Sequence, residues 1–327
     1  MELKQYQQGV LNKLDRYLTV LAERREQAEE FLEFQKSKGK TATLGDFCRD
    51  AWDQLNTERL LPYLYKDGDP VVAPYLSRHD GLGLSIPNIC FKVPTGGGKT
   101  LLATAALERI QTDYFKRQTG LILWVVPSEA IYRQTWKQLA NREHPYRQML
   151  ERASGGRVKI LEKGDAFTHR DVEGQLCVML LMLPSAARKS KETLRLFRDS
   201  GRFTSFFPVE DDGEANWAFL DKVPNLDQND LSDMGFGDGI VPGSISIKQS
   251  LGNVLRLVRP VIVIDEGHKA YSDTARNTLA GFNPRFMLEL SATPNTNNKH
   301  QSNVLVNVPG TGSQGRGDDQ AAHQCGQ

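Results

Sequence analysis

Residues 92–101 read KVPTGGGKTL and follow the apolar run IPNICF. Consecutive glycines let backbone N–H groups turn toward an anion, and a helix that begins after them points its positive end at the same place. A lysine and a threonine, Lys99 and Thr100, come directly after the glycines. The stretch therefore predicts a phosphate-binding loop between a strand that ends near Val93 and a helix that begins near Lys99.

Each residue of such a loop has an expected role. Lys99 would reach the β and γ phosphates, and the Thr100 hydroxyl would hold Mg²⁺. The pattern G-x-x-x-x-G-K-[ST] has glycine where this chain has Val93. Taken alone, the stretch also fits a glycine-rich turn before an ordinary helix. The residues expected to bind the nucleotide here are Thr95, Gly96, Gly97, Gly98, Lys99 and Thr100.

Short apolar runs alternate with helical stretches on both sides of this loop, over residues 86–300. Strands that are apolar throughout are typical of a parallel sheet covered by helices on both faces. We therefore expect an α/β layer fold. An acidic, glycine-rich excursion at about 189–249 is predicted to be an insertion. Residues 310–327 contain five Gly, four Gln and no Leu, Ile, Val or aromatic residue, so this tail is predicted to be disordered.

Residues 1–85 are predicted to form an amino-terminal helical region. A long helix is expected over residues 3–35, because four leucines recur at helical spacing. A second helix is expected around residues 44–60. The leucines of the stripe are Leu11, Leu14, Leu18 and Leu21.

The composition is that of an ordinary water-soluble protein. The 327 residues carry 41 Lys and Arg against 40 Asp and Glu, a formal net charge of +1, which neither indicates nor excludes nucleic acid binding. The apolar runs are too short to cross a bilayer, and the amino terminus has no signal-peptide pattern. A cytoplasmic location without membrane contact is expected. The four cysteines are widely separated, which suggests neither disulfides nor a zinc site: Cys48, Cys90, Cys177 and Cys325.

The stretch VIVIDEGHKA, residues 261–270, places two adjacent carboxylates after an apolar strand. In a nucleotide site, Asp265 would hold the metal and Glu266 would orient or deprotonate the attacking water. Alternatively, Asp265 would only cap a helix. With the glycine loop expected on a neighbouring strand, the nucleotide site is favoured, because ligands of open α/β sheets bind at the carboxyl ends of strands.

A third stretch, LELSATPN, ends the next apolar strand with Ser291 and Thr293. PTGGGKT, DEGH and SATP, in this order and in these strand contexts, resemble the first three motifs of superfamily 2 helicases and translocases. The resemblance covers roughly residues 3–294. It implies a RecA-like P-loop lobe with an amino-terminal helical extension, ATP and Mg²⁺ as cofactors, and ATP hydrolysis. In this family a small residue other than glycine commonly stands at the position of Val93.

The resemblance implies roles for residues on either side of these motifs. LKQYQQ is similar to an adenine-reading motif, with Gln7 as the candidate contact and Gln8 as a weaker one. An exposed glutamine on the first helix fits Gln7 equally well. His268 would couple the ATP site to Ser291 and Thr293, although a lone histidine there could simply cap a helix.

Two further stretches resemble segments that contact the nucleic acid backbone. VVPSEAIYRQT offers Pro127 and Ser128, because a hydroxyl and free N–H groups at a strand end suit phosphate contacts. LMLPSAAR occupies the place of a second contact, with Ser185 as the candidate beside Pro184 and Arg188. These contacts position the protein and do not read sequence.

The motif sequences PTGGGKT and IDEGHKA are most similar to those of the restriction subunits of type III restriction endonucleases and related phage-defence helicases. This narrower resemblance implies DNA as a partner, double-stranded, together with a modification or specificity subunit. The residues themselves leave RNA and single strands open. A complete motor has a second lobe that supplies an arginine to the γ-phosphate. We therefore expect an amino-terminal fragment whose tail reads as out-of-frame sequence, and which binds ATP weakly and hydrolyses it slowly.

Two other functions remain compatible with these motifs. A lone lobe could bind nucleotide or DNA without turnover until a partner supplies the missing half. A small-molecule kinase or nucleotide switch could use the same phosphate loop. The SATP and VVPSEA stretches argue against the second alternative, since a switch needs no nucleic acid track.

Overall fold

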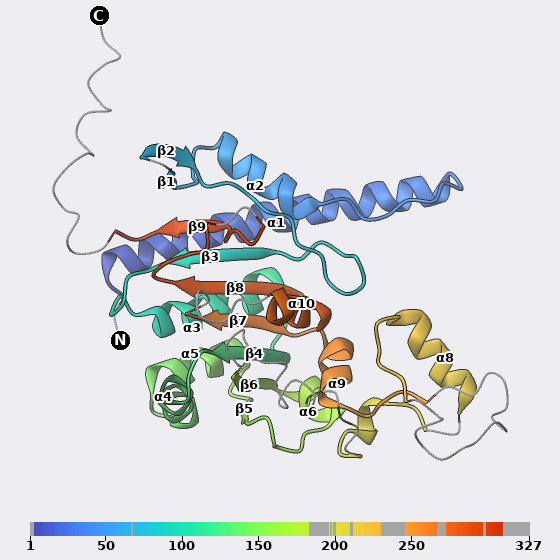
Figure 1. The fold of residues 1–327 in the computed structure, drawn as a ribbon. Helices are drawn as coiled ribbons and strands as arrows, with labels where there is room; N and C mark the ends of the chain where they lie inside the picture. The colour runs from blue at the N-terminus through green and yellow to red at the C-terminus, as the bar shows by residue number, and fades with distance from the viewer. Residues whose placement is uncertain are drawn as a thin grey trace, which may run out of the picture.

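The computed structural model describes residues 3–66, 68–182, 196, 198, 201–209, 212–229, 246–266, 273–296 and 299–309. Their centre is a seven-stranded sheet in the order β5-β6-β4-β7-β8-β3-β9 (Figure 1). Every neighbouring pair in this sheet is parallel. The strands are β3 (Asn88–Lys92), β4 (Gly120–Val126), β5 (Val158–Leu161), β6 (Leu176–Met182), β7 (Val261–Asp265), β8 (Phe286–Ser291) and β9 (Val304–Asn307).

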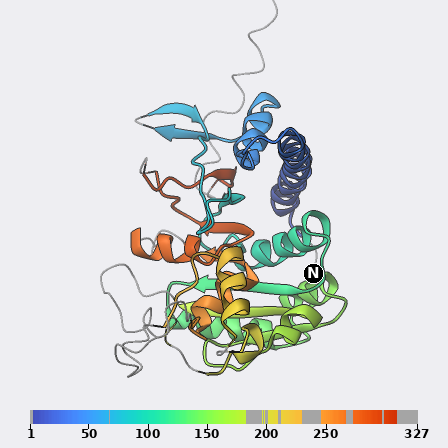
Figure 2. The same ribbon diagram turned by 90° about the vertical axis from the view of Figure 1, so that its right-hand side faces the viewer.

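Side chains on the central strands alternate between two apolar cores. On β4, Ile122 and Trp124 join one core, whereas Leu121, Leu123 and Val125 join the other. Both sets are buried because helices cover both faces of the sheet, as Figure 2 shows. The α/β layer fold expected from the apolar runs is therefore confirmed.

The helices divide between the two faces. One face is covered by α1 (Gln5–Ser37), α2 (Phe47–Thr57), α3 (Lys99–Arg109) and α5 (Pro145–Ala153), with α4 (Glu129–Ala140) packed against α5 and β6. The other face is covered by α6 (His169–Gly174), α9 (Leu251–Val258) and α10 (Asp273–Gly281). A π-helical turn, Ile110–Tyr114, extends α3.

The amino-terminal helix is anchored by its apolar stripe. Its predicted leucines are all buried, and they pack in the same core as α2 and the sheet. The far end of α1 leaves this core, and Phe31 and Phe34 are exposed there. A small antiparallel hairpin, β1 (Tyr63–Lys66) with β2 (Asp69–Val72), follows α2 and was not anticipated in a region expected to be helical.

Three observations concern the boundaries expected from sequence. Strand β9 lies beyond residue 300 and pairs with β3, at the sheet edge nearest α1. Within the expected insertion at about 189–249, the structure describes a 3-10 turn (Thr204–Phe206) and α8 (Gly213–Lys222). The expected tail, residues 310–327, lies outside the described residues. No described helix has the length and apolar character that a membrane span requires.

Candidate nucleotide site

The glycine loop lies between β3 and α3, as the sequence predicts. Gly96 and Gly98 adopt left-handed backbone conformations, with φ of +79° and +72°, which side-chain-bearing residues rarely adopt. Gly97 is required for a different reason. A Cβ atom there would lie 2.7 Å from Val93 Cγ1 and 2.9 Å from the Pro94 carbonyl oxygen. The buried Val93 therefore fits beneath the loop only because residue 97 has no side chain.

The first turn of α1 packs against this loop. The Tyr6 hydroxyl donates a hydrogen bond to the Gly97 carbonyl oxygen (2.9 Å), and Gln7 Nε2 donates to the Tyr6 hydroxyl (3.3 Å). The Gln7 side chain is 4% exposed, and a Cβ atom on Gly98 would lie 2.8 Å from its Nε2. Gln7 is thus not a solvent-facing glutamine. Gln8, the weaker candidate, is exposed and bonds Asn12.

The orientation of the Gln7 amide is fixed by the helix start. Its Oε1 accepts a hydrogen bond from the Lys4 backbone N–H (2.9 Å), which satisfies a backbone donor at the amino end of α1. Tyr6 was missed as a site residue. The only sequence signal for it was its place beside Gln7 in LKQYQQ.

Lys99 and Glu266 meet at the centre of the candidate site. Lys99 Nζ forms an ion pair with Glu266 Oε1, and the two side chains are 10% and 15% exposed. Glu266 directly follows β7 and has a φ of +54°, which is unusual for a residue with a side chain. The loop lysine therefore lies against the predicted water-activating carboxylate.

Asp265 is the last residue of β7 and is buried beside this pair. Its Oδ1 has no hydrogen-bond partner among the described residues. The pKa of Asp265 is raised to about 6, chiefly by burial; the charge of Lys99 lowers the pKa and that of Glu266 raises it. A buried carboxylate oxygen that no donor satisfies suits a hard cation such as Mg²⁺. Thr100, half-buried in the first turn of α3, is the second predicted ligand.

Strand β8 links the two parts of the site. The sequence argument expected the glycine loop on a strand neighbouring β7, and this is wrong, because β8 lies between β3 and β7. The Val93 N–H donates to the Ser291 carbonyl oxygen (3.0 Å), while Asp265 pairs with Leu290 on the other side of β8. Strand β8, which ends in the SATP segment, therefore pairs with the strand that precedes each of the other two motifs.

The side chains of the SATP segment differ in exposure. Ser291 is buried, and its Oγ accepts a hydrogen bond from the Thr293 N–H (3.2 Å), whereas Thr293 is exposed. Ser291 is the last residue of β8, and Thr293 follows two residues later. Figure 1 shows that β3, β7 and β8 point the same way, toward the edge where α1 begins.

The predicted nucleic acid contacts lie partly within the described residues. Pro127 and Ser128 follow the carboxyl end of β4, so they lie at the same edge of the sheet as the loop. Ser128 is exposed and caps α4, accepting from the Ile131 N–H at 3.5 Å. Ser185 and His268 lie outside the described residues, as do Pro184 and Arg188.

Comparisons with known proteins found one family model and a solved structure similar to this chain. A family model described as "Type III restriction enzyme, res subunit" matches residues 85–296. Among solved structures, the UvsW helicase from bacteriophage T4 is 12% identical over 81% of this chain and 70% of its own, with a TM-score of 0.31. No curated protein matches this sequence. Because the family model spans more than half of the chain, from before the glycine loop to beyond the SATP segment, the chain belongs to the family of type III restriction enzyme res subunits.

Proposed function

We propose that this chain is the ATP-binding motor domain of a DNA-dependent ATPase of the helicase or translocase class. The observation that carries the proposal is the meeting of Lys99 with Glu266, beside the buried Asp265, at the edge where the glycine loop lies. Membership of the res-subunit family supports the same reading and favours a type III restriction endonuclease or a related phage-defence helicase as the complete assembly.

Nucleotide binding would rearrange the Lys99–Glu266 pair. The phosphates would lie over the N–H groups of the glycine loop, and the Lys99 ammonium would turn from Glu266 to the β and γ phosphates. Glu266 would then be able to accept a proton from the attacking water. Thr100 and Asp265 would hold Mg²⁺, which neutralises charge on the phosphates when bound. Gln7 would contact the adenine.

The nucleic acid would bind along the same edge of the sheet. Pro127 and Ser128 offer backbone and hydroxyl groups to phosphates, and Ser185 is proposed as the second such contact. His268, Ser291 and Thr293 would couple hydrolysis to this track. Double-stranded DNA and a modification or specificity subunit are the proposed partners, in the cytoplasm.

The test is to measure nucleotide binding and turnover in the purified chain and in Glu266→Gln. The amide keeps the shape of Glu266 but cannot act as a base, so we expect Glu266→Gln to retain Mg–ATP binding. Its hydrolysis should fall by roughly 10²–10⁴-fold. Titration by calorimetry gives binding, and phosphate release gives turnover, each with duplex DNA, single-stranded DNA or RNA added. Equal hydrolysis by the variant and the wild type would contradict the role of Glu266.

The same measurements distinguish the proposed motor from the main alternative. A nucleotide- or DNA-binding module that requires a partner lobe would bind Mg–ATP without turnover, whatever polynucleotide is added. A nucleotide affinity that no polynucleotide changes would favour a kinase or switch. Failure of Mg–ATP to bind at all would overturn the proposed site.

A further inference from the structure

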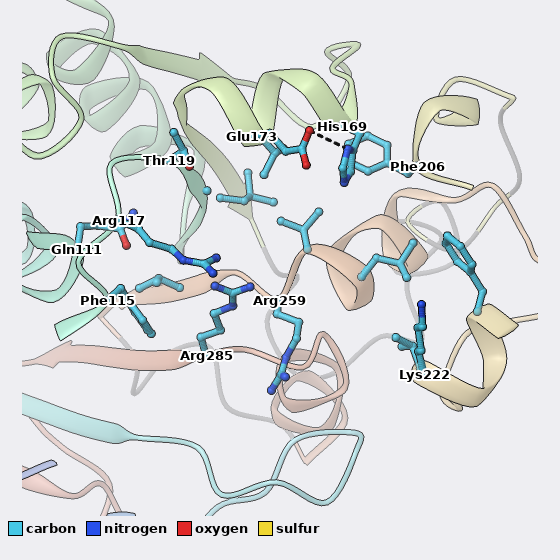
Figure 3. A pocket seen from close by; sticks show the side chains of 18 residues that line it. Gln111, Phe115, Arg117, Thr119, His169, Glu173, Phe206, Lys222, Arg259 and Arg285 are labelled. Atoms are coloured by element: carbon cyan, nitrogen blue, oxygen red, sulfur yellow. Dashed lines mark ion pairs between the residues drawn. The ribbon is translucent and has the colours of Figure 1, made fainter. Parts of the chain in front are cut away.

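A second candidate site lies at the opposite edge of the sheet. A cavity of about 630 Å³ opens where β4 and β7 begin, so Gly120 and Val261 line it. The glycine loop follows the carboxyl end of β3, whereas the cavity lies at the amino ends of β4 and β7. Because the strands of the seven-stranded sheet are parallel, the length of the sheet separates this cavity from Lys99. Figure 3 shows the cavity from close by.

The described lining of this cavity is strongly basic. Three arginines from three separate segments border it: Arg117 after the π-helical turn, Arg259 after α9 and Arg285 before β8. Lys222 at the end of α8 adds a fourth cation. Glu173 is the one carboxylate among the described lining residues, and it bonds His169 (3.2 Å).

Arg117 and Arg285 lie close together within this basic lining. Figure 3 shows their guanidinium ends pointing toward one another. A second cavity of about 420 Å³ shares Phe115 and all three arginines with the first, so the guanidinium groups lie between two open spaces. Burial, and the positive charges of Arg117, Arg259 and Arg25, lower the pKa of Arg285 to about 10.

The other two arginines whose charges act on Arg285 already have carboxylate partners. Arg259 Nη2 pairs with the buried Asp80 (2.9 Å), and Arg25 Nε pairs with Glu29 (2.8 Å). In the part of the chain that the structure describes, neither Arg117 nor Arg285 has a carboxylate within 4.0 Å. Arg285 is partly buried and Arg117 is exposed. Two cations held close together without a counter-charge repel one another, and an anion that binds both relieves this repulsion.

The backbone fixes these arginines in place. The Arg285 N–H donates to the Pro260 carbonyl oxygen (3.0 Å), and the Arg117 N–H donates to the Gln111 carbonyl oxygen (3.0 Å). Arg259 and Lys116 adopt left-handed conformations, with φ of +56° and +51°. The left-handed conformation of Arg259 ends α9, where its N–H donates to the Leu255 carbonyl oxygen.

The chemistry of the lining indicates a class of ligand. Guanidinium groups match the oxygens of a phosphate with two parallel hydrogen bonds. Phe115, Phe206 and Leu257 provide aromatic and apolar wall for the rest of the molecule. A volume of about 630 Å³ is in the range of small-molecule sites. We propose that this cavity is a second ligand site that binds a phosphate group through Arg117 and Arg285, separate from the glycine loop.

Two sources could supply that phosphate: a free nucleotide, or the backbone of a nucleic acid strand. The test uses the full chain carrying Lys99→Ala, so that the glycine loop contributes little to phosphate binding. Calorimetric titrations are made without Mg²⁺, using inorganic phosphate, AMP and a short single-stranded DNA. Saturable binding of phosphate or AMP supports a free nucleotide as the source. Binding of the oligonucleotide alone supports the strand.

The variant that tests the residues is Arg117→Gln combined with Arg285→Gln. We expect it to bind the phosphate probe at least tenfold more weakly, since both guanidinium groups are lost. Arg152→Gln is the matched control, because Arg152 is an exposed arginine on α5 paired with Glu108. It should bind as the parent does. Arg117→Lys combined with Arg285→Lys keeps the positive charges but loses the paired N–H donors of each guanidinium group. Its affinity for the phosphate probe should lie between those of the parent and the double glutamine variant.

Thermal unfolding keeps this test independent of folding defects. Removing both unneutralised like charges should leave the unfolding midpoint without ligand unchanged or higher, while abolishing the upward shift that phosphate gives the parent. No binding of any probe to the Lys99→Ala chain, or equal binding by the double glutamine variant, would overturn the second site. Loss of ATP binding in Lys99→Ala with phosphate binding retained distinguishes it from the proposed ATP site.

Discussion

Lys99 at the start of α3 and Glu266 at the end of β7 form an ion pair across 167 positions of sequence. The pair joins the residue expected to bind phosphates with the residue expected to activate water. Both side chains are largely buried, and an unpaired charge would be costly there. Each partner therefore neutralises the other at the place where a nucleotide would bind. Phosphate oxygens would therefore have to replace Glu266 as the partner of Lys99.

Replacing Lys99 by alanine should weaken ATP binding by about 10–100-fold, because charge-assisted hydrogen bonds are worth roughly 1.5–3 kcal/mol each. Calorimetric titration with Mg–ATP measures the change. Lys137→Ala is the control, since Lys137 is an exposed lysine on α4. An unchanged affinity in Lys99→Ala would remove the glycine loop from nucleotide binding.

Glycine 97 should tolerate no side chain. In Gly97→Ala the new Cβ atom would meet Val93 Cγ1 and the Pro94 carbonyl oxygen, both below 3.0 Å. We expect a loss of about 1–3 kcal/mol in the free energy of unfolding, as overpacking usually costs, together with weaker ATP binding. Urea unfolding measures the first effect. The control is Gly45→Ala, where a Cβ atom meets nothing within 4 Å. Equal stability of the two variants would mean that Val93 does not constrain the loop.

The Tyr6 hydroxyl should contribute to nucleotide binding without touching the phosphates. Tyr6→Phe removes only the hydrogen bonds to Gly97 and Gln7, each worth about 0.5–1.5 kcal/mol net. We expect ATP affinity to fall by roughly 3–10-fold, because the loop loses a fixed contact with α1. Tyr63→Phe, on the exposed hairpin, is the matched control. The same affinity in both variants would show that α1 does not hold the loop.

Ionisation of Asp265 should make stability depend on pH. Its pKa is about 6 in the folded protein, above its ordinary value of 3.8, so the folded state binds the proton more tightly than the unfolded chain does. The stabilisation is fully present below about pH 4 and is lost as pH rises to about 6, by up to about 3 kcal/mol. Asp265→Asn should lack this loss.

The check is urea unfolding of wild type and Asp265→Asn between pH 4 and pH 7, without Mg²⁺. Other carboxylates titrate equally in both proteins, so the difference between the two free energies isolates Asp265. A difference that stays constant across this range would mean that Asp265 is not held with a raised pKa.

Much of the fold could be predicted because its signals are local. Apolar runs such as the one ending at Asp265 are buried on both faces, so their composition alone indicates a covered parallel sheet. The leucine stripe of α1 repeats at helical spacing, and the conformations of Gly96 and Gly98 follow from a short glycine pattern. The hairpin after α2 was missed, because two four-residue strands carry too little periodicity to be distinguished from a loop.

The sequence by itself therefore determined the elements and the residue types brought to the candidate nucleotide site. Only the tertiary structure decided which of them meet. It placed β8 between β3 and β7, turned Gln7 against Gly98, and paired Lys99 with Glu266. It also gathered Arg117 and Arg285 at the opposite edge. These relationships depend on strand order and on contacts between distant segments, which long-range packing sets and which no local pattern encodes.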